Sequence, residues 1–136
     1  MLLPLHKQSY REFKQVLRLM DETVKQGNDG SGLKSEVTKL QQFFQTKILI
    51  LNTNELPPEV EQRVQSYQVE IDKQLRLLGM DVMFLQAARQ ARTGEQRRKQ
   101  VGDRILTLMR YCDALLEEGE GVEGWMGGSP GLPVKE

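Results

Sequence analysis

The fold is decided by residues 60–91, which read VEQRVQSYQVEIDKQLRLLGMDVMFLQAARQA. Apolar side chains recur in this stretch at steps of three and four: Val60, Val64, Tyr67, Ile71, Leu75, Leu78, Val82 and Leu85. This period is typical of an amphipathic α-helix that turns one face to a core. A second set of residues widens the apolar stripe: Leu77, Met80, Phe84, Ala87, Ala88 and Ala91. The pattern therefore predicts a long, broadly buried helix at the centre of a helical bundle.

The length of this helix has a consequence for assembly. At about 1.5 Å per residue, 32 residues span about 48 Å. Shorter neighbouring helices would leave part of this length uncovered, and a second subunit is the simplest cover. We therefore expect a homodimer at micromolar concentration.

Two further helices are predicted before this stretch. The first begins near Pro4, which is tolerated in an opening turn because it has no amide hydrogen to leave unpaired. One narrow apolar seam follows along it: Leu3, His6, Tyr10, Phe13, Leu17, Met20 and Val24. Residues 27–32 contain three glycines and predict a turn. The second helix then carries Leu33, Val37, Leu40, Phe43, Phe44 and Ile48. The run Ile48–Leu51 fits either a short strand or a buried last helical turn, and we expect a helix because no second strand is available to pair with it.

The boundaries of the last two helices follow from their capping residues. Pro57 and Pro58 break the chain, so the long helix is expected to start near residue 58. Thr93 and Gln96 have the spacing of a capping box, which places the start of the fourth helix near Thr93. Its apolar face is Val101, Ile105, Leu106, Leu108, Met109, Cys112, Leu115 and Leu116. Gly119 is a plausible stop. The predicted organisation is a helical bundle domain over 1–118 and a flexible Gly/Pro-rich tail over 119–136.

The tail differs in composition from the rest of the chain. It is rich in glycine and has no hydrophobic period, so it cannot repay the entropy of ordering and is expected to be disordered. Trp125 is its one large aromatic residue. It either packs loosely on the domain, stays exposed, or belongs to a short partner-binding motif.

Charge and cysteine content narrow the class of protein. Lys plus Arg and Asp plus Glu both total 19, so no net field favours nucleic acid or an anionic membrane. A single cysteine, Cys112, excludes an intramolecular disulfide and fits a reducing compartment. The first residues lack the apolar core of a signal peptide, and no apolar run is long enough to span a membrane. We expect a cytoplasmic protein that neither binds nucleic acid nor inserts into membranes.

A search for reaction chemistry finds no candidate catalytic, metal-binding or cofactor-binding residues. Residues 27–35 superficially resemble a phosphate-binding loop, but Leu33 stands where the lysine must follow the second glycine, and no strand precedes the loop. His6 is the only histidine, and Cys112 lies on an apolar seam, so both are read as packing residues. Neighbouring carboxylates such as Glu117 and Glu118 are read as solvated charges.

One group of charges is unusually concentrated. Positive side chains bracket the expected turn between the third and fourth helices: Arg89, Arg92, Arg97, Arg98 and Lys99. We call these five residues the basic cluster, and Arg104 lies two turns beyond Arg97. In one account, Arg89 and Arg92 stabilise the C-terminus of their helix through its dipole and the rest form a solvated face. In the other, an acidic protein surface or peptide docks there, which makes these residues the candidate partner-binding site.

Two stretches carry a resemblance to a known family. Residues 64–90, together with Arg110-Tyr111-Cys112, resemble the cyanobacterial heterocyst-frequency-control family PatD, and the similarity runs from about Leu3 to Leu116. The resemblance implies a non-enzymatic cytoplasmic regulator that links cell division to heterocyst differentiation, plausibly by binding the tubulin-like division protein FtsZ. It transfers no binding residue to a position of this chain.

Two other classes of function stay open on the sequence. One is a purely structural helical oligomer. The other is a small-ligand binder with a site between helices, for which Gln74 and Asp81 are the polar residues nearest the inward face of the long helix.

Overall fold

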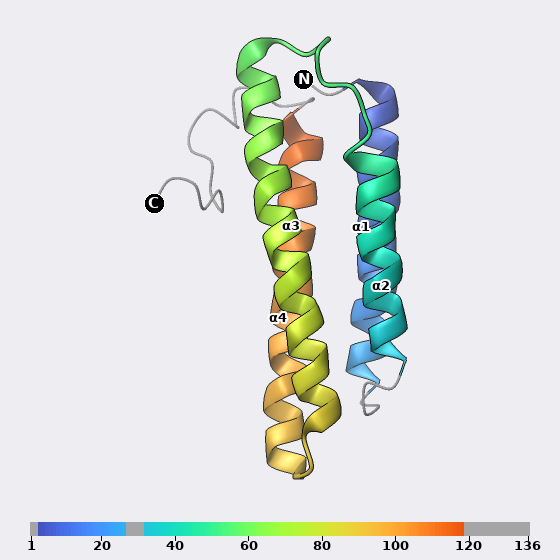
Figure 1. Ribbon diagram of the computed structural model, residues 1–136, viewed down its shortest axis with the longest axis vertical. Coiled ribbons are helices and arrows are strands. Elements are labelled where there is room, and N and C mark those ends of the chain that lie inside the picture. Colours follow the sequence, from blue (N-terminus) through green and yellow to red (C-terminus); the bar gives the residue numbers. More distant parts are fainter. Residues whose placement is uncertain (1–2, 27–31, 119–136) are drawn as a thin grey trace.

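The computed structural model describes residues 3–26 and 32–118 of the chain. Its elements in these ranges are four α-helices and one π-helical turn: α1 (Pro4–Lys25), α2 (Leu33–Phe43), η1 (Phe44–Ile48), α3 (Pro58–Ala87) and α4 (Ala91–Glu118). Successive helices run in opposite directions along one long axis (Figure 1). The all-α, four-helix fold predicted from the hydrophobic period is confirmed.

The four helices enclose one core. α1 packs against α2 and α4, and α3 packs against the same two helices, so each helix has two neighbours. Every residue of the predicted α1 seam from His6 to Val24 is buried, as is the central α3 series from Val64 to Leu85. Cys112 is fully buried among these side chains, as a structural thiol should be. A narrow apolar stripe on each helix is therefore enough to build the bundle.

The predicted starts of α1 and α3 are confirmed. α1 begins at Pro4, after Leu3 in an extended conformation, and α3 begins at Pro58. Glu59 and Glu61 stand in the first turn of α3, where the helix dipole favours negative charge.

The predicted end of the long helix and start of the fourth are wrong. α3 ends at Ala87 rather than residue 91, because Ala88 takes an extended conformation with φ −69° and ψ 130°. α4 then begins at Ala91, and the Gly94 amide already donates to the Gln90 carbonyl at 2.9 Å. Thr93 therefore lies within the first turn of α4 and is not its cap. Leu85 is the last buried residue of α3, so the helix continues for only two residues past its contact with the core.

The apolar run Ile48–Leu51 is neither a strand nor a fully buried helical turn. Ile48 closes η1 and is buried, whereas Leu49 and Ile50 are 45% and 71% exposed in the turn that follows. The Leu51 amide donates to the Ile48 carbonyl at 3.1 Å, which closes this turn. The π-helical turn carries Ile48 into the core and leaves the next two residues outside it.

The broad burial predicted for the middle of α3 is also wrong. Met80 and Phe84 are 50% and 45% exposed, Ala87 and Ala91 are exposed, and Leu77 and Ala88 are partly covered. Residues at these positions point away from the core, because α2 and α4 flank only the side that carries Leu78, Val82 and Leu85. The second apolar set therefore forms an outward face and does not thicken the core.

Some sequence predictions lie outside the described residues. These are the glycine-rich turn over 27–31, the stop at Gly119, and the tail over 119–136 with Trp125. Among the described helices, none is both long and apolar enough to cross a membrane.

Candidate protein-binding surface

α3 and α4 project beyond the other two helices at one end. α3 has 30 residues and α4 has 28, whereas α1 has 22. At about 1.5 Å per residue, α3 is about 12 Å longer than α1. Figure 1 shows the α3–α4 turn lying beyond the ends of α1 and α2. The expected overhang is therefore present, but α4 accompanies α3 along it and covers one of its sides.

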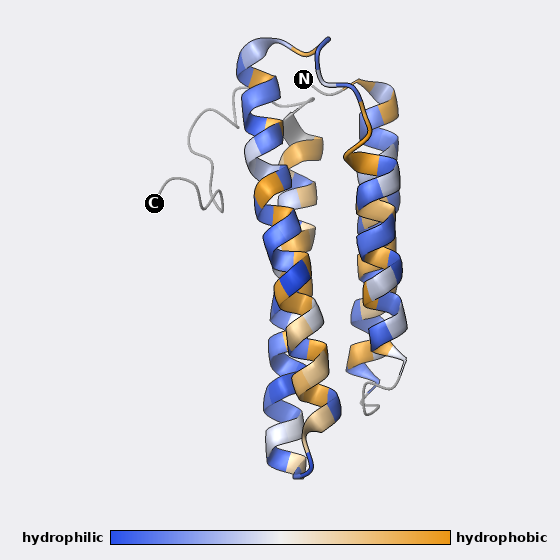
Figure 2. Cartoon of the chain, viewed as in Figure 1, coloured by the Kyte–Doolittle hydropathy of each residue, from blue (hydrophilic) through white to orange (hydrophobic). Residues whose placement is uncertain are grey.

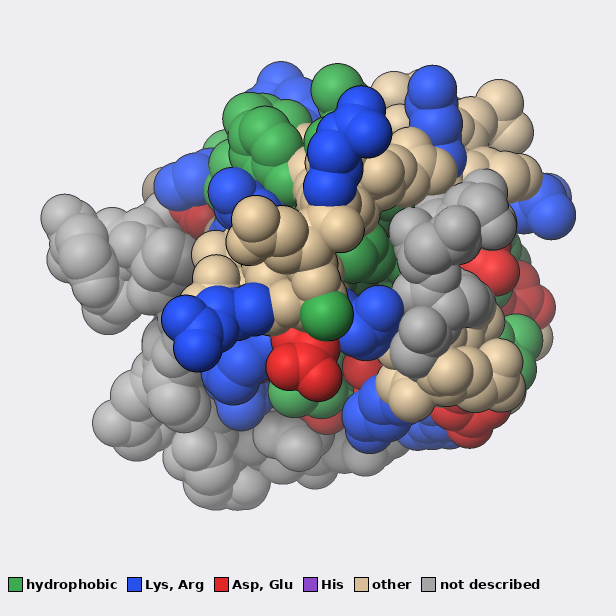
Figure 3. All heavy atoms as spheres, turned by 90° about the horizontal axis from the view of Figure 1, so that it is seen from below, with side chains coloured by type: hydrophobic (Ala, Val, Ile, Leu, Met, Phe, Trp, Pro, Cys, Tyr) green, Lys and Arg blue, Asp and Glu red, His purple; other side chains and the backbone are tan. Residues whose placement is uncertain are grey.

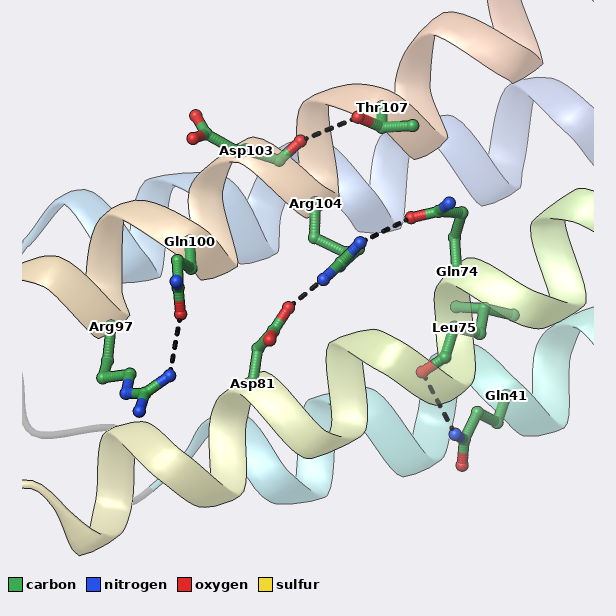
Figure 4. Close-up of polar contacts among 9 residues, drawn as sticks. All are labelled: Gln41, Gln74, Leu75, Asp81, Arg97, Gln100, Asp103, Arg104 and Thr107. Atoms are coloured by element: carbon green, nitrogen blue, oxygen red, sulfur yellow. Dashed lines mark hydrogen bonds and ion pairs between the residues drawn. The ribbon is translucent and has the colours of Figure 1, made fainter. Parts of the chain in front are cut away.

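A polar contact fixes α3 against α4 near this end. The Arg104 Nε atom donates to the Asp81 carboxylate at 2.9 Å, and the Arg104 Nη1 atom donates to the Gln74 Oε1 atom at 3.1 Å (Figure 4). Asp81 is 7% exposed. Gln74 and Asp81 do point inward, as expected, but α4 supplies their partner. Arg104 is therefore a structural residue and not an extension of the basic cluster.

The members of the basic cluster differ in their surroundings. Arg89 lies in the connection between the helices and Arg92 in the first turn of α4, and both are exposed without an ion pair to any described residue. Arg97 lies 4.7 Å from the centre of the Phe84 ring and donates to Gln100 at 3.1 Å. Lys99 pairs with Asp103 at 3.3 Å. Arg89 and Arg92 are thus positive charges without a carboxylate partner among the described residues, whereas Arg97 and Lys99 contact neighbouring side chains.

The tip combines the C-terminal end of α3 with the N-terminal end of α4, whose helix dipoles have opposite signs. α3 has no basic residue in its last turn, and α4 has no acidic residue in its first turn. Arg92 stands instead at the positive end of the α4 dipole. Arg92 therefore does not lie at the C-terminus of the long helix as expected, whereas Arg89 does follow the C-terminal end of α3.

Beside the basic cluster lies an exposed hydrophobic stripe on α3. It consists of Met80, Met83 and Phe84, which are 50%, 58% and 45% exposed, and we call it the outer stripe. Figure 2 shows several hydrophobic residues along this half of α3, and Figure 3 shows hydrophobic side chains gathered among Lys and Arg at this end. Methionine and aromatic side chains adapt well to an apolar partner. Met83 escaped the sequence analysis, although its spacing from Met80 and Phe84 already indicated a second apolar face.

A hollow of about 380 Å³ lies between the end of α1 and the start of α4. Val24 and Leu106 give it apolar walls, and Arg98, which is partly buried, stands at its edge. Two pairs of opposite charge neutralise much of its rim: Asp21 with Lys25 at 3.1 Å and Lys99 with Asp103. The rim therefore selects no particular charge of ligand. In the described residues, no three His, Cys, Asp or Glu side chains come together as a metal site.

Arg97 joins the basic cluster to the outer stripe, because its guanidinium on α4 covers the Phe84 ring of α3. A segment that combined carboxylates with apolar side chains would match both the cluster and the stripe. No protein-family model, no curated protein and no solved structure matches this chain.

Proposed function

We propose that this protein is a non-enzymatic, cytoplasmic regulator that binds an acidic segment of a partner protein at the projecting end of α3 and α4. The observation that carries the proposal is the presence of unneutralised arginines and an exposed apolar stripe on one helical hairpin, α3 and α4. A core needs neither feature. Both suit a docking surface.

The physical support has two parts. Arg89 and Arg92 have no carboxylate partner in the described fold, so an acidic segment would gain their attraction without displacing an existing ion pair. The outer stripe leaves three large side chains in water, and contact with a partner would remove that apolar surface from solvent. Charge would speed encounter, and the apolar contact would slow dissociation.

The resemblance to the PatD family supplies the first partner to test. It implies binding to FtsZ and a role in linking cell division to heterocyst differentiation. Both are proposals for this chain, and the basic cluster is our own suggestion for the contact surface.

The test is a titration against purified cyanobacterial FtsZ at two salt concentrations. We expect Arg89→Glu combined with Arg92→Glu to weaken binding by at least about tenfold, because two attractive charges become repulsive. Added salt should weaken binding of the unchanged protein in the same direction. The melting temperature should stay close to that of the parent, because exposed charges contribute only about 0–1 kcal/mol.

A matched control reverses two exposed charges elsewhere, Arg11→Glu with Lys39→Glu, which changes the net charge by the same amount. This control should bind as the parent does. Equal losses in both double variants would show a general charge effect and remove the basic cluster as the site. An absence of any binding by the parent would remove FtsZ as the partner.

A further inference from the structure

The chain itself contains a segment that combines carboxylates with apolar side chains, as a ligand of this surface should. Residues 117–126 read EEGEGVEGWM, with four glutamates within seven residues and no Lys or Arg before Lys135. Val122, Trp125 and Met126 supply large apolar side chains directly beside the glutamates. We call residues 117–126 the acidic segment. Positive and negative residues total 19 each, so the chain has no net charge. Its basic cluster and its acidic segment nevertheless concentrate charges of opposite sign in different regions.

Within one chain, the acidic segment cannot reach the unpaired arginines. Arg92 and Glu118 stand near opposite ends of α4, 26 residues apart, which is about 39 Å at about 1.5 Å per residue. Glu123 follows Glu118 by five residues, which span at most about 18 Å when fully extended. The gap of about 21 Å exceeds the reach of two side chains. Any contact between these glutamates and Arg92 must therefore join two molecules.

We propose that the acidic segment of a second copy of this chain docks on the basic cluster and the outer stripe. Its glutamates would pair with Arg89 and Arg92, and Trp125 would pack on the outer stripe. Two copies lying antiparallel bring each C-terminal end of α4 beside the other copy's α3–α4 turn. Each molecule then receives the other's segment, which closes a two-fold dimer.

The docked segment would occupy the surface that the proposed function assigns to a partner, on which this inference rests, so self-association would regulate partner binding. The acidic segment and a partner's acidic segment would occupy the same place, so self-association and partner binding would exclude each other. Self-association is measured without any partner, so either proposal can fail while the other stands.

The first test is sedimentation equilibrium of the full chain at micromolar concentration in low salt. Three samples decide it: Arg89→Glu with Arg92→Glu, Glu120→Arg with Glu123→Arg, and an equimolar mixture of the two. We expect the parent to show a dimer mass and each double variant alone to show a monomer mass. The mixture should regain the dimer mass. In a mixed dimer, the reversed cluster of one variant meets the reversed segment of the other, and the native cluster meets the native segment, so both contacts join opposite charges. The control Arg11→Glu with Lys39→Glu should dimerise like the parent.

Trp125 provides a second readout because it is the only tryptophan in the chain. Its fluorescence emission should shift to shorter wavelength as the protein concentration rises through the range of dimerisation, since the indole leaves water. The shift should be absent in Arg89→Glu with Arg92→Glu. It should also shrink in Met83→Ser, which removes apolar surface from the outer stripe at an exposed position.

Three results would overturn the inference. A parent that stays monomeric in low salt has no such contact. A dimer that survives both double variants uses another surface. If both variants melt at the parent's temperature and their mixture does not regain the dimer mass, the two charge groups do not meet.

Discussion

Neighbouring residues on α3 have opposite environments, and this contrast governs what a substitution does. Leu78 is fully buried, whereas Met80, two positions later, is 50% exposed. Removing a buried methyl group costs both its transfer from water and the cavity that it leaves. Removing an exposed one costs neither. Hydrophobicity alone therefore does not tell which α3 residues stabilise the fold.

For this reason, we expect Leu78→Ala to lower the free energy of unfolding by about 2–5 kcal/mol. Met80→Ala should change it by no more than about 0.5 kcal/mol, as exposed substitutions do. Urea denaturation followed by circular dichroism measures both values. Equal losses in the two variants would show that α3 is covered on its outer side.

Cys112 gives a residue-scale prediction about reactivity and pH. Burial raises the pKa of the thiol above its ordinary value of 9.0 in the folded protein. The unfolded thiol ionises near 9.0 and the folded one does not, so this group favours unfolding as pH rises past that value. We expect a thiol reagent to react only after unfolding, and stability to fall on the alkaline side. Rapid labelling of the native protein at pH 8 would contradict the buried position.

At the scale of elements, α3 and α4 share a polar contact between unequal partners. The Asp81 side chain is only 10% exposed, whereas the Arg104 side chain is 29% exposed. Without Asp81, the guanidinium can still turn to water. Without Arg104, a carboxylate stays buried with its ion partner gone, which is the costlier loss.

Arg104→Ala should therefore lower the free energy of unfolding by about 1–3 kcal/mol relative to the parent. Asp81→Ala should lower it by less. The double variant Asp81→Ala with Arg104→Ala should recover part of this loss, because no buried charge is left unpaired. Chemical denaturation of the three variants gives the coupling energy directly. A double variant that is less stable than Arg104→Ala alone would argue against a buried carboxylate.

At the scale of the whole molecule, one core joins all four helices. Buried side chains from α1, α2, α3 and α4 belong to a single cluster. A bundle of this size with one core has no part that can unfold independently without exposing the rest.

We accordingly expect one cooperative unfolding transition. Helix content, followed by circular dichroism, and exposure of the Cys112 thiol should change at the same urea concentration. Two separate midpoints would indicate that the projecting end of α3 and α4 unfolds by itself.

The sequence by itself determined the helices and their inner faces. Steps of three and four in α1 and α3 identified nearly every core residue, because this period places side chains on one side of a helix whatever its neighbours are. Prolines located the starts of α1 and α3, since proline acts on the backbone locally. The basic cluster was visible for the same reason, as a run of charge close together in the chain.

Only the tertiary structure decided which apolar residues are left outside. Met80, Met83 and Phe84 fit a wide core as well as they fit an exposed face, and the choice depends on where α2 and α4 lie. The contact of Arg104 with Asp81 and the cover that Arg97 gives Phe84 likewise join residues from different helices. Helix register and relative length set these contacts, and a periodic pattern read along one helix carries no information about either.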